Sequence, residues 1–271
     1  VTLIAVLPHT SVTLTSLTTK AAWYQSILPG QFTLEHYSTA LGHPLAVGSI
    51  RNSLFYATCA VAIDLAFGLL TGYLIVRTRV WGRTLIDSLA MLPLAVPGLV
   101  MAFGYVAMTL RWPFGEGDPL HGVIDVIGAE PNPIPLLIIA YAVRRLPYVV
   151  RATVAGLQQT SGEMEEAALN LGAGKLRAIR TVVIPLIAAN LIAGALLAFS
   201  FAMLEVSDSL ILAQREAHFP ITKAIYVLFE RLGDGLYIAS AMGVWGMALL
   251  AVTLIGASLL IGRRMGAIFR V

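Results

Sequence analysis

Charged residues are scarce in this chain. Of its 271 residues only 12% are Asp, Glu, Lys or Arg, whereas 58% are hydrophobic and the mean hydropathy is +0.81. Soluble domains carry roughly a quarter of their residues as charged ones, because these residues cover the surface. The shortage of charge therefore excludes an ordinary soluble domain and predicts a membrane protein.

Cysteine and clustered histidine are also lacking. Cys59 is the single cysteine, which excludes an intrachain disulfide and a cysteine-based metal site. The five histidines show no HxxxH spacing, so we expect no metal centre and no cofactor. The net charge of +3 does not cluster on one polar face, which argues against nucleic acid as a partner.

Motifs of enzyme chemistry are missing as well. The chain contains neither Gly-x-Ser-x-Gly nor His-Glu-x-x-His, so no catalytic residue is predicted. Gly174-Lys175 is similar to the end of a phosphate-binding P-loop, but Leu169 stands where that motif needs glycine. The chain is therefore not expected to hydrolyse ATP.

Long apolar runs are what the sequence does contain. A helix needs roughly 20 apolar residues to cross a bilayer, and its backbone hydrogen bonds have to be satisfied within the segment. The runs that meet or approach this length are residues 1–17, 53–76, 88–110, 135–150, 183–204 and 236–261. We interpret the first, short run as a truncated helix, with a cleaved signal peptide as the alternative. The sequence thus predicts an all-α polytopic membrane protein with six transmembrane helices.

Lys and Arg are distributed unevenly over the connections between these runs. Nine of them lie in the 42 residues of loops 77–84, 159–182 and 262–271, and only six lie in the 88 residues of the alternate loops. By the positive-inside rule the first set of loops faces the cytoplasm, which also places both termini there. No repeat and no linker divides the chain, so we expect one domain over residues 1–271.

The loop between the fourth and fifth spans, residues 160–185, is predicted to form two short helices, and we call it the knuckle. Thr160 and Glu163 have the spacing of a capping box. One apolar face at helical spacing follows, formed by Met164, Ala167, Ala168 and Leu171. Gly172 and Gly174 are expected to end this first helix. The second helix, with Leu176, Ile179 and Val183 on one side, leads to Pro185 at the start of the fifth span.

The knuckle resembles the EAA loop of binding-protein-dependent ABC importer permeases. The residues that match at the family's spacing are Glu166, Ala167, Ala168, Gly172 and Pro185. Val182 and Ile184 replace the family's Ile and Leu, which is a mild departure. The resemblance implies a cytoplasmic coupling loop that docks on separate ABC ATPase subunits. An ordinary amphipathic loop is the alternative.

The same resemblance implies the cellular setting and the other partners. The chain is expected in the lipid bilayer of a bacterial inner membrane, paired with a second permease half or a homodimer partner. Its substrate would come from an extracytoplasmic binding protein, either periplasmic or lipid-anchored. An ATP-independent secondary transporter is the competing class of function.

Three further segments are similar to the ferric iron subgroup of this family. They are residues 51–54, 91–98 and 205–213. Related permeases for thiamine, polyamines, sulfate and molybdate share much of this pattern, so several cargoes stay open. Some members of the subgroup carry two six-helix halves on one polypeptide. The chain fits the C-terminal half of such a protein, and an arbitrary fragment boundary is the alternative.

Several residues are candidates for a translocation pathway. They are Asp64, Pro93, Pro97, Gly98, Glu205 and Asp208. Pro93 and Pro97-Gly98 interrupt the third span, as in helices that line a pathway or in a plain packing kink. Asp64 lies near the middle of the second span, where a carboxylate is costly unless it is paired, protonated or facing a cavity. The outer-loop acids could attract a cation or contact a binding protein, although most of them are expected to be solvated.

The fourth span carries an unusual number of arginines. Arg144, Arg145 and Arg151 flank Pro147. We expect a short helix that is broken at Pro147 and extends its guanidinium groups toward the cytoplasm. Contact with an anionic cargo is the alternative reading of these arginines.

Overall fold

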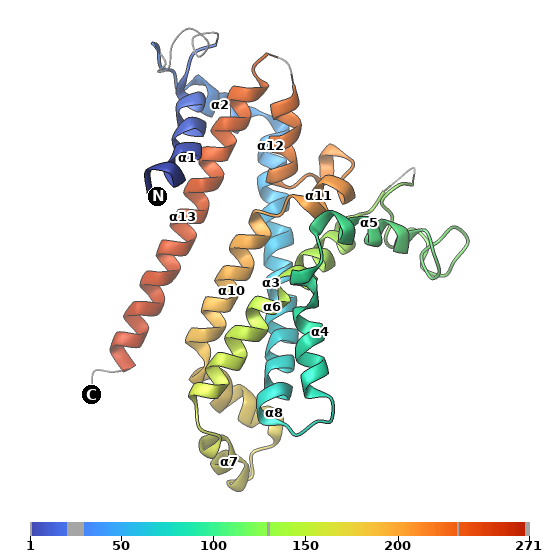
Figure 1. Ribbon diagram of the computed structural model, residues 1–271, viewed down its shortest axis with the longest axis vertical. Coiled ribbons are helices and arrows are strands. Elements are labelled where there is room, and N and C mark those ends of the chain that lie inside the picture. Colours follow the sequence, from blue (N-terminus) through green and yellow to red (C-terminus); the bar gives the residue numbers. More distant parts are fainter. Residues whose placement is uncertain (1, 21–29, 129–130, 232, 269–271) are drawn as a thin grey trace. The chain divides into compact units, whose positions relative to one another are not determined.

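Figure 1 shows the computed structural model of the chain, which describes residues 2–20, 30–128, 131–231 and 233–268. Within these ranges every regular element is helical, and an isolated bridge between Thr18 and Phe32 is the only extended pairing. The all-α prediction is confirmed. The α-helices are α1 (Thr2–Leu17), α2 (Glu35–Gly42), α3 (Pro44–Arg77), α4 (Arg83–Ala95), α5 (Gly98–Thr109), α6 (Ile134–Gln159), α7 (Glu163–Asn170), α8 (Lys175–Ala178), α9 (Ile184–Leu186), α10 (Ala188–Met203), α11 (Ser207–Leu212), α12 (Ile221–Glu230) and α13 (Gly235–Ile268). A π-helical turn, Ile179–Val183, joins α8 to α9, and a 3₁₀ turn, Glu216–His218, precedes α12.

The chain folds as two compact units. The described residues of 1–55, 106–137 and 203–253 form the first unit, and those of 56–105, 138–202 and 254–271 form the second. α3 and α13 each contribute to both units. The knuckle belongs entirely to the second unit.

The helices differ in whether they are long and apolar enough to cross a bilayer. Among the described residues, α3 and residues Gly235–Gly256 of α13 are long and apolar enough by themselves. Two bent pairs reach that length only if each pair is one span: α4 with α5, and Lys175–Leu186 with α10. α6, which contains three arginines, is not among these candidates. The count of six spans therefore stays a prediction.

The third predicted span, residues 88–110, is not one continuous helix. α4 ends at Ala95, α5 begins at Gly98, and the pair is bent by 104°. Val96 is extended (φ −94°, ψ 128°), as expected for a residue before proline. Pro97 also lacks the N–H that would continue the helical hydrogen bonds. Pro93, in contrast, lies inside α4 without ending it.

The expected break at Pro147 is wrong. α6 runs through this proline for 26 residues. The flanking side chains pack on α10: the Tyr148 ring stacks on Phe201 at 4.9 Å, and Arg145 Nη2 donates to the Phe201 carbonyl at 3.0 Å. Arg151 pairs with Asp87 of α4 at 3.1 Å. Contacts with neighbouring helices thus hold the helix together around a proline, as is common in packed membrane helices.

Two glycines of α3 lie at the contact between α3 and α6 in the second unit. Gly68 and Gly72 lie one turn apart on α3, in a Gly-x-x-x-Gly arrangement that lets two helices approach closely. A methyl group at Gly68 would come within 2.6 Å of Val149 Cγ1, and one at Gly72 within 2.6 Å of Thr153 Cγ2. The two glycines are therefore required by this helix contact.

We predict that Gly72→Ala destabilises the fold by about 1–3 kcal/mol, because an added methyl group overpacks the contact between α3 and α6. Gly48→Ala is the matched control on the same helix, since nothing lies within 4 Å of its added Cβ. Thermal unfolding in detergent measures both variants. Equal melting temperatures for the two would contradict the close approach of the helices.

In the first unit, residues 51–54 form hydrogen bonds with the segment that leads into α12. Asn52 Nδ2 donates to the carbonyls of Ala217 at 2.8 Å and Phe219 at 3.1 Å. Ser53 Oγ accepts a hydrogen bond of 2.8 Å from the backbone N–H of Ile221, the first residue of α12. The segment thus fixes the turn that leads into α12: Asn52 binds two carbonyls of that turn, and Ser53 satisfies one of the N–H groups that the helix start leaves unpaired.

Candidate functional site: the knuckle and the polar residues of the helices

The knuckle forms a compact corner at one end of the second unit (Figure 1). After α6 ends at Gln159, three residues lead into α7, and α8 follows the glycine corner at residues 172–174. The predicted pair of short helices is confirmed. The expected capping box is wrong, because α7 has Gly162 at its N-cap without a side-chain cap. Thr160 Oγ1 contacts the carbonyls of Gly156 and Leu157 instead.

Gly172 makes the corner between the two helices. Its φ is +89°, in the left-handed region that side chains disfavour. The Gly172 N–H donates to Leu169 O at 2.9 Å, and the Ala173 N–H donates to Ala168 O at 3.0 Å. These two bonds make up a Schellman motif, in which glycine at this position ends a helix. The sequence-based role of Gly172 as a helix stop is therefore explained by its backbone.

Large apolar side chains of the knuckle are exposed, and we call this set the apolar crown. Met164 is 57% exposed, Leu171 90% and Leu176 80%. Leu176 was expected to share a face with Ile179 and Val183, but only those two lie toward the interior. Met164 lies on α7, Leu171 directly follows it and Leu176 lies on α8, so both short helices of the knuckle expose large apolar side chains. Ala167 and Glu166 are also exposed here, and Ala168 is half-buried.

Glu165, rather than the motif residue Glu166, is the buried acid of α7. It is only 8% exposed. Tyr73 Oη donates a hydrogen bond to Glu165 Oε1, and Arg77 Nε lies 3.8 Å from Glu165 Oε2. Arg77 is one of the basic residues of loop 77–84 that orient the spans, and its contact with Glu165 was not predicted. The i, i+4 spacing of Tyr73 and Arg77, which puts both on one face of α3, is the signal that was available.

Pro185 stands where the chain bends toward α10. Residues Lys175–Leu186 and α10 are bent by 78° relative to each other. Pro185 cannot donate a backbone hydrogen bond, and the preceding turn, Ile179–Val183, is π-helical. Val183 and Ile187 of this bend are buried against Tyr73, Leu157 and Leu191. Pro185 was predicted to start the fifth span, but it lies in the short helix α9 (Ile184–Leu186), and α10 begins after the bend, at Ala188.

Asp64 is fully buried on α3. Neither of its carboxylate oxygens has a hydrogen-bond partner among the described residues. Arg145 of α6 interacts with it electrostatically. Three other pathway candidates also belong to the second unit: Pro93 lies inside α4, whereas Pro97 and Gly98 lie at the bend between α4 and α5.

The remaining pathway candidates, Glu205 and Asp208, belong to the first unit and are buried, at 4% and 0% exposure. Glu205 Oε1 accepts a hydrogen bond of 3.3 Å from the Asp208 N–H at the start of α11. These two buried acids are exceptions to the expectation that most outer-loop acids are solvated. Glu130, an acid of the predicted outer loop 111–133, lies outside the described residues.

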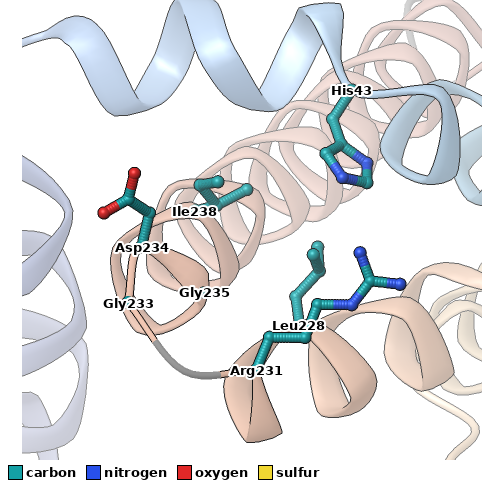
Figure 2. Close-up of a pocket in the computed structure, with 7 residues that line it drawn as sticks. All are labelled: His43, Leu228, Arg231, Gly233, Asp234, Gly235 and Ile238. Atoms are coloured by element: carbon teal, nitrogen blue, oxygen red, sulfur yellow. The ribbon is translucent and has the colours of Figure 1, made fainter.

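A pocket of about 380 Å³ lies in the first unit, around the start of α13 (Figure 2). Its lining consists of His43, Leu228, Arg231, Gly233, Asp234, Gly235 and Ile238. Arg231 pairs with Glu216 at 2.7 Å, and Asp234 accepts a hydrogen bond from Lys20, which raises the pKa of that lysine. The charged groups of the lining are thus engaged with partners in surrounding segments.

The all-α fold, with at least two helices among the described residues that are long and apolar enough to cross a bilayer, is typical of an α-helical membrane protein. Residues 64–267 match the family described as the binding-protein-dependent transport system inner membrane component. The chain belongs to this family. The match covers α4 to α12 entirely and therefore includes the whole knuckle.

Two relatives illustrate the range of the family. The chain is 31% identical over 236 residues to the ferric transport system permease protein FbpB of Actinobacillus pleuropneumoniae. The aligned region covers 82% of this chain and 32% of that protein. It is also 31% identical over 174 residues to the sulfate transport system permease protein CysT of Salmonella typhimurium. This aligned region covers 63% of this chain and 60% of the relative. The chain thus spans about a third of the length of the ferric relative.

Solved structures support the same fold. A bacterial ABC transporter that imports the acidic polysaccharide alginate matches with a TM-score of 0.71 and 19% identity, over 95% of this chain and 91% of that one. The alginate transporter in complex with its pentasaccharide-bound periplasmic protein matches with a TM-score of 0.68 and 18% identity, over 97% and 92%. At these identities the likeness shows the fold.

Proposed function

We propose that this chain is the membrane-spanning permease component of an ATP-driven ABC importer in a bacterial inner membrane. The knuckle is the observation that carries the proposal. Its crown exposes Met164, Leu171 and Leu176 beside the small Ala167, so a partner surface can approach closely. Membership of the binding-protein-dependent family supports the same conclusion.

In this proposal the chain is a single permease domain, residues 1–271, with six spans and the knuckle as its cytoplasmic coupling loop. It pairs with a second permease half or with a second copy of itself, and separate ABC ATPase subunits hydrolyse the ATP. An extracytoplasmic binding protein delivers the cargo. The alginate transporter, which was solved with a periplasmic protein, supports that part of the assembly by analogy.

Transport would follow an alternating-access cycle. Closure of the ATPase dimer moves the docked knuckles, and the spans then change from a cytoplasm-open to a periplasm-open state. ATP and the loaded binding protein each favour one state, so together they shift the population. Asp64, Pro93, Pro97, Gly98, Glu205 and Asp208 remain the proposed pathway residues.

Ferric iron is the proposed cargo. Ferric permeases are among the relatives, and the similarity to one of them extends over 82% of this chain. The described residues contain no group of three or more His, Cys, Asp or Glu that could hold a metal ion, so the proposal assigns recognition of iron to the binding protein. Metal analysis and mass spectrometry of the ligand retained by the co-purified binding protein test this. Iron would support it, whereas sulfate, molybdate, thiamine or a polyamine would replace it.

An ATP-independent secondary transporter is the second candidate, and one observation favours it. Asp64 is a buried carboxylate inside a membrane helix, and both of its oxygens lack a hydrogen-bond partner among the described residues. Buried acids of this kind couple transport to protons or ions in other transporters. Transport that persists after the ATPase subunits are disabled would favour this candidate over the ABC importer.

The proposed topology makes a prediction for cysteine labelling. Ala173→Cys in the knuckle should react with a membrane-impermeant reagent only from the cytoplasm, and Gly117→Cys only from the periplasm, because Lys and Arg concentrate in the cytoplasmic loops. Gly117 is exposed, so its reagent access is not limited by burial. Cys59→Ser serves as the unreactive background. Periplasmic labelling at residue 173 would contradict the coupling role of the knuckle.

A further inference from the structure

The last turn of α3 contacts the knuckle at three separate points. Arg77 Nη2 donates to Thr160 O at 2.8 Å and to Thr160 Oγ1 at 3.1 Å, ahead of α7. Tyr73 and Arg77 together engage Glu165 inside α7. The ammonium group of Lys175, at the start of α8, lies 5.6 Å from the centroid of the Tyr73 ring. Both arms of the glycine corner are therefore attached to one helix.

We propose that Tyr73, Arg77 and Glu165 form a tether that transmits movement of the knuckle directly to α3. This inference rests on the proposed coupling function of the knuckle. The three are positioning residues, because they act on a transport helix through the knuckle and make no contact with cargo. The dock for the ATPase and the tether are separate: Glu166 and the apolar crown face outward, and Glu165 faces α3.

The knuckle is also connected along the chain to α10, and the geometry of that connection explains why a tether to α3 is needed. Between the knuckle and α10 the chain passes through the π-helical turn Ile179–Val183 and a bend of 78°. A displacement of the knuckle can change the angle of this bend without moving α10, since the helical hydrogen bonds are interrupted there. α3, by contrast, is one continuous helix from Pro44 to Arg77. The tether thus connects the knuckle to an unbroken element.

α3 also carries Asp64, nine residues before Tyr73. At a rise of about 1.5 Å per residue, the two lie about 14 Å apart along the helix axis. A displacement of Tyr73 therefore moves the buried carboxylate with it, because an α-helix is stiff over this length. The knuckle, where the ATPase is proposed to dock, is thus connected through α3 to Asp64, a proposed pathway residue.

The contact can be weakened with little disturbance of the core. Tyr73→Phe removes only the hydroxyl group that donates to Glu165, and it keeps the ring that packs against Val183 and Ile187. Glu165→Gln keeps the shape of the side chain but removes its charge. Glu163→Gln is the matched control, since Glu163 is an exposed acid of the same helix and lies outside the tether.

The test uses the complete importer, with ATPase subunits and binding protein, reconstituted in vesicles. We expect Tyr73→Phe and Glu165→Gln to keep their ATPase subunits but to raise the ATP hydrolysed per substrate imported about tenfold, the factor that corresponds to loss of one charge-assisted hydrogen bond. The loss in the double variant should be smaller than the sum of the two single losses, because both changes weaken the same charge-assisted hydrogen bond. Glu163→Gln should keep the wild-type ratio.

Each other outcome counts against the tether. A wild-type ratio in both single variants would show that the contact is not used in coupling. Equal losses of hydrolysis and uptake, with the ratio unchanged, would show a purely structural role, and a fully additive double variant would show that the residues act separately. Should Glu165→Gln fail to insert, Tyr73→Phe alone decides between these results. Absence of ATP-driven uptake by the wild-type complex would instead refute the proposed function.

Discussion

Gly172→Ala is expected to reduce uptake by the reconstituted importer about five- to thirtyfold. Gly172 has a φ of +89°, and a side chain in the left-handed region costs about 1–2 kcal/mol. A free-energy change of that size alters a population about 5–30-fold. Because the Schellman bonds orient α8 relative to α7, the strained corner would seldom present the docking surface correctly. Stimulation of the ATPase by loaded binding protein should fall in parallel.

Two companion variants separate backbone strain from contact with the partner. Gly174→Ala is the control, since Gly174 has φ −66° and ψ 154° and no atom lies within 4 Å of an added Cβ. It should behave as wild type. Space around Gly172 is equally open, so Gly172→Leu should cost no more than Gly172→Ala in the isolated chain. Any extra loss in the complex measures the fit against the ATPase. Wild-type uptake in Gly172→Ala would show that the corner is not required.

Glu166→Lys is expected to detach the ATPase subunits. Glu166 is exposed on α7 beside the apolar crown, where a partner cation can pair with it. Loss of one buried ion pair and gain of a repulsion cost about 2–5 kcal/mol at an interface, which is more than tenfold in affinity. Retention of the ATPase subunits by the purified permease in detergent measures the effect directly, and membrane insertion should be unchanged.

Glu163→Lys is the matched control for this charge reversal. Both acids lie in the first turn of α7 and are exposed. A lysine at either position has the same unfavourable interaction with the helix dipole, about 0.3–1 kcal/mol, and changes the net charge equally. Only Glu166 belongs to the proposed docking motif. Equal retention of ATPase subunits in the two variants would remove Glu166 from the interface.

Much of the knuckle could be predicted from the sequence because it depends on near neighbours in the chain. The helix at residues 163–170 follows from apolar spacing, and the corner at Gly172 follows from the backbone freedom of glycine. Similar local chemistry predicted the interruption at Pro97. At Pro147 the same rule failed, because Tyr148 and Arg145 pack on α10 and hold the helix together there.

The sequence by itself determined that the chain is an all-α membrane protein with a glycine-cornered loop, because hydropathy, periodicity and turn chemistry are local properties. Only the tertiary structure decided that Glu165 is buried and Glu166 exposed. Successive residues of a helix point about 100° apart, so one of two adjacent acids meets a covering helix and the other does not. The covering residue, Tyr73, is 92 positions away from Glu165 in the chain. Which face of α7 is covered therefore depends on how distant helices pack, and no local pattern records it.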